Sequence, residues 1–287
     1  LDQHHAVGLP QADPGGQDAR RAGRDVHPRR DLDPSEIIGA ADFPSIFHQT
    51  PREGMELHWD GNNDRVEERN LNASFGTGAT PRLIDHASIA RIQAWNATAE
   101  PPAFGDHFDI DTARAERGKA IYRQYCADCH GASGSDFSGR YVGQVVPLTE
   151  IATDPYRLHS FTPQLALNLG TPYAGTAYRF RSFRKTFGYA NAPMDGMWLR
   201  APYLHNGSVP TLYDLLLPPE QRPRQFYRGY DVYDPVKVGY VTATPEAQRA
   251  GTLHDTGERA NSAQGHDFGP GLTEDERLAL VENLKTL

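Results

Sequence analysis

The sequence has few sulfur-containing residues and no long apolar run, with only two cysteines and three methionines in 287 residues. Two cysteines are too few for a framework of disulfides. No stretch approaches the roughly 20 apolar residues of a membrane-spanning helix, so we expect a soluble chain with no membrane span. The formal net charge of −8 gives no basis for a nucleic acid or an anionic membrane as partner.

Glycine and proline are plentiful, at 27 and 22 residues, which predicts a loop-rich fold around a buried group rather than a dense regular core. Residues 1–33 contain few large apolar side chains, so we expect this segment to be disordered. Its His4–His5 pair is expected to be an exposed pair without a metal. The chain starts at Leu1, and we expect it to be a mature product or a fragment.

Both cysteines fall in one motif, Cys126-Ala127-Asp128-Cys129-His130. The spacing Cys-x-x-Cys-His is that of a c-type haem attachment site, in which two thiols bind the haem vinyl groups and the histidine ligates the iron. A thioredoxin-like redox pair would need a strand before the motif, whereas the preceding residues are helical. A zinc site would need two further close-spaced ligands, which the sequence lacks. We therefore expect one covalent haem c.

A helix capped by Asp111 or Thr112 is expected to lead into the motif, and its buried side is predicted to consist of Ala113, Ala120, Ile121 and Tyr125. Gly118 is unfavourable inside a helix, which indicates a close crossing with another helix. The expected partner is the last helix, where residues 273–276 form a capping box and Leu280, Val281, Leu284 and Leu287 an apolar stripe. This arrangement predicts a mainly α, loop-rich fold: a class I cytochrome c-like haem domain with long insertions.

Other helices are predicted from caps and breakers. Asp85 is expected to cap a helix over residues 86–98, with Ile89, Ile92 and Trp95 as its apolar stripe. Further short helices are expected to start at Thr162-Pro163 and at Pro210-Thr211. The sequence predicts no extended sheet, although it allows short hairpins.

The second axial ligand decides what such a haem can do, since two ligands favour electron transfer and an open face admits peroxide or oxygen. The candidates in the sequence are Met55, Met194, Met197, His159, His205, His254 and His266. We favour His266, because it lies in the loop before the last helix and glycines on both sides of it let the backbone approach a porphyrin. Methionine is more often core filler.

Two further stretches are informative. The run from Arg200 to Leu212 places Arg200, Tyr203 and His205 in a constrained loop, which suits hydrogen bonds to haem propionates. Trp59 lies in a turn-rich segment, where a packing anchor and an electron relay are both consistent with the sequence.

With these residues in place, the chain resembles the di-haem cytochrome c peroxidase superfamily, closest to its haem-dependent rubber oxygenase-like branch. The resemblance covers about residues 34–287. It rests on the haem motif, on residues 51–63, on the run from Arg200 to Leu212, and on the segments 226–235 and 265–269.

The resemblance implies Cys126 and Cys129 as haem attachments and His130 as proximal ligand. It implies His266 as distal ligand and places Arg200, Tyr203 and His205 in the haem pocket. It also implies that Trp59 lies between two haems. Some members of the superfamily carry calcium between domains, and here Asn62, Asn63 and Asn70 would be its candidate ligands.

The chain departs from the family by having one haem motif instead of two, and the missing one belongs to the active-site haem. We therefore expect residues 1–33 to be a segment foreign to the family. Residues 34–104 are expected to form a partial inter-haem region, and residues 105–287 the C-terminal haem domain. The expected function is electron transfer in the periplasm, or outside the cell, to a second haem or redox protein. The alternative is a peroxidase or dioxygenase, so whether the chain is an enzyme stays open.

Overall fold

The computed structural model describes residues 34–269 and 271–287. The expectations for residues 1–33, including the His4–His5 pair, lie outside the described residues. The α-helices are α1 Pro34–Ile37, α2 Val66–Gly76, α3 His86–Asn96, α4 Thr112–Tyr125, α5 Ala127–His130, α6 Leu148–Ile151, α7 Tyr156–Ser160, α8 Pro163–Leu169, α9 Leu212–Leu215, α10 Pro245–Ala250 and α11 Glu274–Leu284. The 3-10 helices are η2 Thr50–Arg52, η3 Phe104–Asp106, η4 Met197–Arg200 and η5 Pro219–Gln221.

Six short strands form three antiparallel pairs in the described part of the chain. They are β1 Val145–Pro147 with β2 Gly188–Ala190, β3 Gln225–Arg228 with β6 Thr252–Asp255, and β4 Tyr233–Asp234 with β5 Gly239–Tyr240. Helix accounts for 37% of the structure and strand for 9%. The predicted fold class, mainly α, is therefore wrong: most residues lie in loops, and most helices are one or two turns long because glycine and proline interrupt them.

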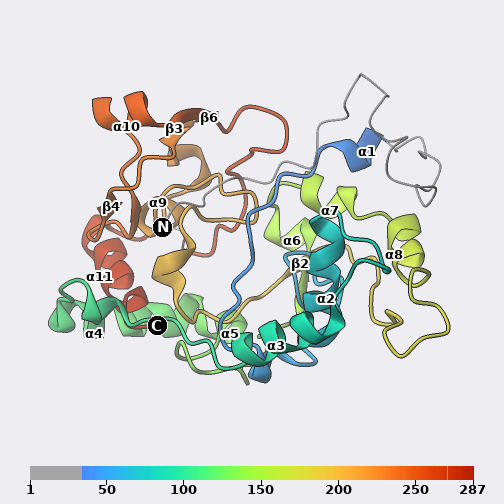
Figure 1. Ribbon diagram of the computed structural model, residues 1–287. Helices are drawn as coiled ribbons and strands as arrows, with labels where there is room; N and C mark the ends of the chain where they lie inside the picture. Colours follow the sequence, from blue (N-terminus) through green and yellow to red (C-terminus); the bar gives the residue numbers. More distant parts are fainter. Residues whose placement is uncertain (1–33, 270) are drawn as a thin grey trace.

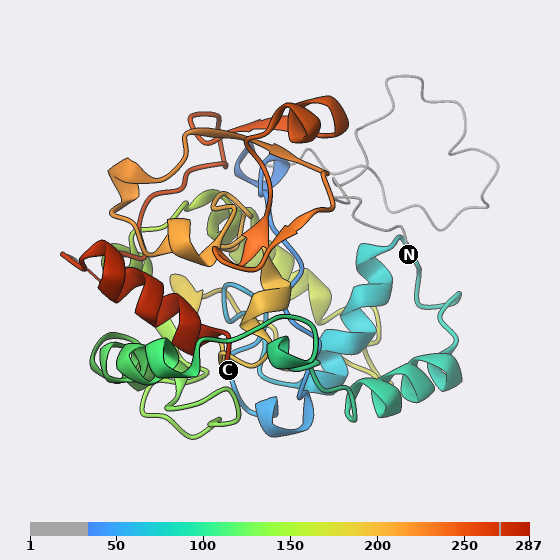
Figure 2. The same cartoon turned by 90° about the vertical axis from the view of Figure 1, so that its left-hand side faces the viewer.

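The predicted crossing of α4 and α11 is confirmed (Figure 1). A Cβ atom added to Gly118 would overlap the carbonyl group of Ala279, so the two helix backbones are in direct contact there. Asp111 caps α4 by accepting from the amide of Arg114 at 2.9 Å. The capping box at Thr273 and Glu276 is also confirmed. Figure 2 shows α11 lying across α4, with the carboxyl terminus of the chain beside them.

The predicted buried face of α4 is wrong except for Ile121, which is partly buried and packs against the main core. Ala113 and Ala120 are exposed, and Tyr125 is 38% exposed. The buried residues are Ala115, Gly118 and Tyr122. Their spacing of three and four residues follows the contact line with α11, where the small residues let the backbones approach. The stripe on α11 is confirmed, since Leu280, Val281 and Leu284 are buried.

Helix α3 starts as predicted, with Asp85 accepting from the amide of Ser88 at 3.1 Å. Its apolar stripe does not pack as predicted, because Ile92 and Trp95 are 53% and 64% exposed. The predicted starts at Thr162 and Thr211 are confirmed by side-chain caps. Among the described residues, no helix is long and apolar enough to cross a membrane.

The largest core cluster lies around α4, α9 and α11 and the loops between them. It contains Tyr122, Met194, Tyr203, Leu212 and Leu280, and Cys126 and Ala127 pack against it. A smaller cluster of Ile151, Leu158 and Tyr189 packs against Trp59. The haem motif thus lies at the edge of the main core.

Candidate functional site

The cysteine pair lies at the end of α4, where the chain makes one further helical turn, α5. The amides of Cys129 and His130 donate to the carbonyl of Cys126 at 3.2 and 3.0 Å. The Tyr122 hydroxyl donates to the Gly131 carbonyl at 2.7 Å and fixes the exit of the turn. The two cysteines do not form a disulfide, and both are partly exposed. One turn of chain therefore presents two thiols and an imidazole together, as attachment of a c-type haem requires.

The ring of His130 is oriented by a backbone carbonyl. Its Nδ1 lies 2.7 Å from the oxygen of Ala192. A carbonyl can only accept, so Nδ1 carries the proton and Nε2 is left as the ligand atom. Burial lowers the pKa of His130, and the charge of Arg200 acts in the same direction. The ring is therefore neutral, the form that binds a metal.

His266 lies in a loop held against the backbone of residues 151–153. Its amide donates to the carbonyl of Ile151 at 2.8 Å. A Cβ atom at Gly265 would overlap the backbone of Ala152, so only glycine allows this approach. The sequence predicted close approach to a porphyrin, and the observed close approach is to this neighbouring turn. Burial lowers the pKa of His266 to about 3, and the nearby His130 and Arg222 contribute smaller shifts in the same direction.

The rings of the two predicted iron ligands lie close together. The ring centres of His130 and His266 lie 6.1 Å apart, with 47° between the ring planes. A metal–imidazole bond is about 2 Å long and the ring centre lies about 1 Å behind the nitrogen, so two axial imidazoles need about 6 Å between centres. The residues present therefore fit a haem iron bound on both faces.

Arg222 holds the His266 loop in place, a role that sequence reasoning missed. Its guanidinium is buried and donates to five backbone carbonyls. The acceptors are Ala263 at 2.6 Å, Gly265 at 2.7 Å, Leu215 at 3.1 Å, His266 at 3.1 Å and Leu217 at 3.2 Å. This one side chain thus joins the His266 loop to the end of α9.

The other candidate ligands lie elsewhere. Met194 is buried in the main core and Met197 packs against it. Met55 lines a small cavity near Arg52. His254 lies 3.4 Å from the Ser208 hydroxyl, and the Nε2 atom of His205 lies 3.1 Å from the Tyr189 hydroxyl. His159 lies on α7, one residue after the buried Leu158.

Of the predicted propionate contacts, Arg200 is the one with a free donor. Its Nη2 contacts an Asp195 carboxylate oxygen at 2.8 Å, while its buried Nε has no partner. Tyr203 already donates to the carbonyl of Val238 at 3.1 Å and contacts that of Met197 at 3.3 Å.

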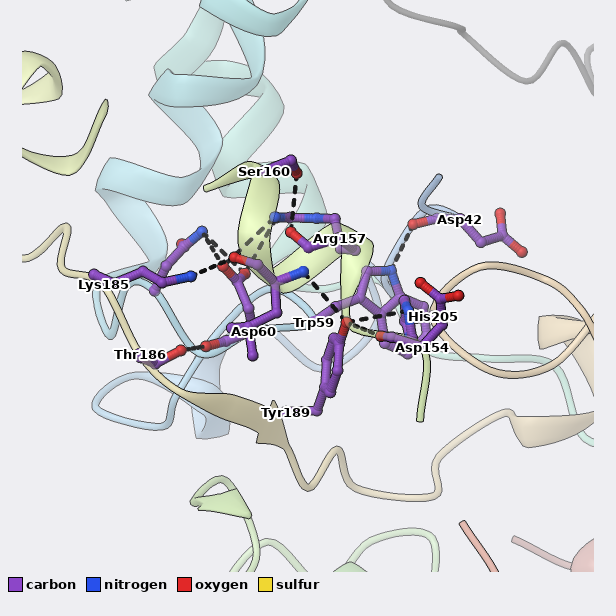
Figure 3. Close-up of polar contacts among 12 residues, drawn as sticks. Asp42, Trp59, Asp60, Asp154, Arg157, Ser160, Lys185, Thr186, Tyr189 and His205 are labelled. Carbon is purple, nitrogen blue, oxygen red and sulfur yellow. Dashed lines mark hydrogen bonds and ion pairs between the residues drawn. The ribbon is translucent and has the colours of Figure 1, made fainter. Parts of the chain in front are cut away.

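Trp59 and His205 form a separate cluster with Tyr189 (Figure 3). The Trp59 indole donates to the Asp42 carbonyl at 2.5 Å, and the His205 ring stacks on Tyr189 with 4.2 Å between centres. The carbonyl of Trp59 accepts from Ala190, two residues before the carbonyl that orients His130. Trp59 as an electron relay stays a prediction.

The side-chain nitrogen atoms of the candidate calcium ligands donate to protein groups, while the buried Oδ1 of Asn62 has no hydrogen-bond partner. Asn62 donates to Asp60, Asn63 donates to Glu68, and Asn70 exchanges amide hydrogen bonds with Gln49. Over residues 34–269 and 271–287, no group of three or more carboxylate, histidine or cysteine side chains is placed to hold a metal ion. Calcium is therefore unsupported.

Comparison with known proteins agrees with part of this description. Residues 188–228 match the family model described as RoxA-like, cytochrome c-like. The chain is 30% identical over 250 residues to the uncharacterized protein y4iM of Sinorhizobium fredii, covering 79% of this chain and 56% of y4iM. It is 31% identical over 237 residues to the uncharacterized protein y4iJ of the same organism, covering 62% and 39%.

The chain thus spans about half the length, or less, of these two relatives. The matched segment 188–228 contains Ala192, Arg200 and Arg222. Of these, Ala192 is the residue whose carbonyl orients His130. Residues 188–228 are therefore similar to a RoxA-like, cytochrome c-like domain, which supports a haem domain of the cytochrome c type.

Proposed function

We propose that residues 105–287 form a c-type cytochrome domain that transfers electrons. Cys126 and Cys129 attach the haem, and His130 and His266 ligate its iron. The observation that carries the proposal is the 6.1 Å separation of two partly buried imidazoles, one in a Cys-x-x-Cys-His motif. When bound, the haem supplies an iron that changes oxidation state by one electron.

The surrounding residues have roles suited to electron transfer. The carbonyl of Ala192 fixes the orientation of His130, and Arg222 fixes the loop of His266. Two imidazoles held in place would ligate the iron in both oxidation states, an arrangement that favours electron transfer over reaction with peroxide or oxygen. The electron partner would be a second haem or another redox protein.

Covalent haem attachment takes place outside the cytoplasmic membrane in bacteria, so we propose a periplasmic or secreted location. The two longer relatives allow a second redox site in a longer protein. A peroxidase or oxygenase activity would then belong to that whole protein.

The test is the absorption and EPR spectrum of the protein matured in a host that attaches c-type haem. The wild type is expected to be low-spin and unchanged by peroxide. His266→Ala is expected to become largely high-spin, because one axial ligand is lost. His159→Ala is the matched control and should keep the wild-type spectrum. A His266→Ala spectrum that stays low-spin would show that His266 is not the ligand.

A further inference from the structure

A small cavity lies between the segment from Pro44 to Trp59 and the segment from Ala190 to Pro193. Its volume is about 40 Å³, enough for a carboxylate group or roughly three waters. Ala192 and Pro193 form part of its wall, and the carbonyl of Ala192 accepts from His130. The cavity therefore borders the residue that orients His130.

Three arginines line this cavity: Arg52, Arg69 and Arg200. Asp195 forms ion pairs with Arg52 and Arg200. Within the described residues, Arg69 has no carboxylate in ion-pair contact; its Nη2 donates to the carbonyl of Ser45 at 2.8 Å. Asp195 thus pairs with two of the three guanidinium groups, and it also contacts Nδ1 of His48 at 3.1 Å.

The acidic residue that lines the cavity, Glu56, does not balance these charges. Glu56 is paired with Arg184 at 2.5 Å, so its charge is already shared. Arg52 and Arg69 are both buried. Burial lowers the pKa of Arg69 to about 10, and the charge of Arg52 contributes a smaller shift in the same direction. Buried cations without a counter-charge are costly, which indicates that an anion completes the site.

Two polar atoms in the same wall have no partner. They are the Nε of Arg200 and the Nε2 of His58, and both are buried. An unsatisfied buried donor costs about 1–3 kcal/mol in folded proteins, so native structures rarely keep one without a ligand or water. An oxyanion in the cavity would accept from Arg200 and pair with Arg69.

We propose that this cavity is a carboxylate-binding site formed by Arg52, Arg69 and Arg200. The geometry favours a propionate of the haem held by His130 as the carboxylate, because the wall of the cavity contains the residue that orients His130. The choice of a haem propionate as the occupant rests on the proposed function. A free carboxylate or phosphate is the other source of the same chemistry.

The experiment compares the haem-loaded wild type with Arg69→Gln, Arg69→Lys and the control Arg65→Gln, whose side chain is 57% exposed. Two quantities are measured in a zwitterionic buffer. The first is the propionate bending band in the resonance Raman spectrum. The second is the unfolding temperature during titration with acetate and with inorganic phosphate.

If a propionate occupies the site, the Raman band shifts in Arg69→Gln, returns towards its wild-type position in Arg69→Lys, and stays unchanged in Arg65→Gln. If a free anion occupies it, acetate or phosphate raises the wild-type unfolding temperature, and Arg69→Gln removes that rise. A Raman band and an anion dependence that are the same in Arg69→Gln and Arg65→Gln would overturn the proposal. If the wild type carries no haem, the proposed function fails, and the titration still tests the anion site.

Discussion

At the scale of single residues, the position of His266, the proposed distal histidine, depends on the Arg222 guanidinium. Five backbone carbonyls from two separate segments converge on it. A planar group with five donors in a fixed geometry can satisfy all of them, and no other side chain offers this set. The proposed ligand His266 is therefore positioned by a residue 44 places earlier in the chain.

We expect Arg222→Gln to lose part of the low-spin haem signal and to bind added imidazole faster than the wild type. The free energy of unfolding should fall by about 2–4 kcal/mol, because several buried carbonyls lose their donor. Arg222→Lys should be intermediate, since an ammonium reaches fewer of them. Arg224→Gln is the control, because that side chain is 78% exposed. Unchanged imidazole binding in Arg222→Gln would contradict the positioning role.

Sequence reasoning identified the two imidazoles but not their supports. The spacing of the motif and the glycines around His266 are local signals, readable without a structure. The role of Ala192 depends only on its backbone carbonyl, so its side chain gives no signal. Arg222 and Arg69 look like ordinary surface arginines until folding buries them.

At the scale of elements, helix ends were predictable and helix faces were not. Asp85, Asp111, Thr162 and Thr273 cap helices as expected, because capping is a local interaction between neighbouring residues. The buried side of α4 and the packing of α3 depend on which segments lie next to them. The strands are two to four residues long, and two of the three pairs join distant segments, so neither length nor alternation revealed them.

The crossing of α4 and α11 gives a direct test. We expect Gly118→Ala to lower the free energy of unfolding by about 1–3 kcal/mol, because the added methyl group overlaps the carbonyl of Ala279. This penalty exceeds the helix-propensity gain of about 1 kcal/mol.

Gly76→Ala at the end of α2 is the matched control for this test. A Cβ atom there meets nothing within 4 Å, so its stability should be unchanged or slightly raised. Chemical denaturation of both variants measures the difference. Equal stability of the two would mean that the helices separate at no cost.

At the scale of the whole molecule, buried histidines make stability depend on pH. Burial lowers the pKa of His58 and His205 to about 3 and that of His254 to about 4. The unfolded chain takes up these protons near pH 6.5, whereas the folded chain does not. The contribution of these neutral histidines to the free energy of unfolding is therefore fully present above pH 6.5, and it is lost as the pH falls towards 3.

We expect the free energy of unfolding to fall by up to about 1.4 kcal/mol per pH unit for each such histidine below pH 6.5. Asp60 and Asp214, whose pKa values burial raises, act in the opposite direction at the acid end. Urea denaturation at pH 7.5, 6.5 and 5.5 measures the slope. His205→Gln should give a smaller slope than the wild type, and an equal slope would contradict the assignment of a neutral, buried His205.

The contact between Gly118 and Ala279 also has a consequence for the order of events during synthesis. The ribosome makes the motif at residues 126–130 long before residues 274–284. These later residues form α11, the helix that packs across α4, which leads into the motif. Bringing two such distant segments together is a late and entropically costly step. We therefore expect haem attachment to act on an open chain, and the cofactor to be in place before α11 closes the domain around it.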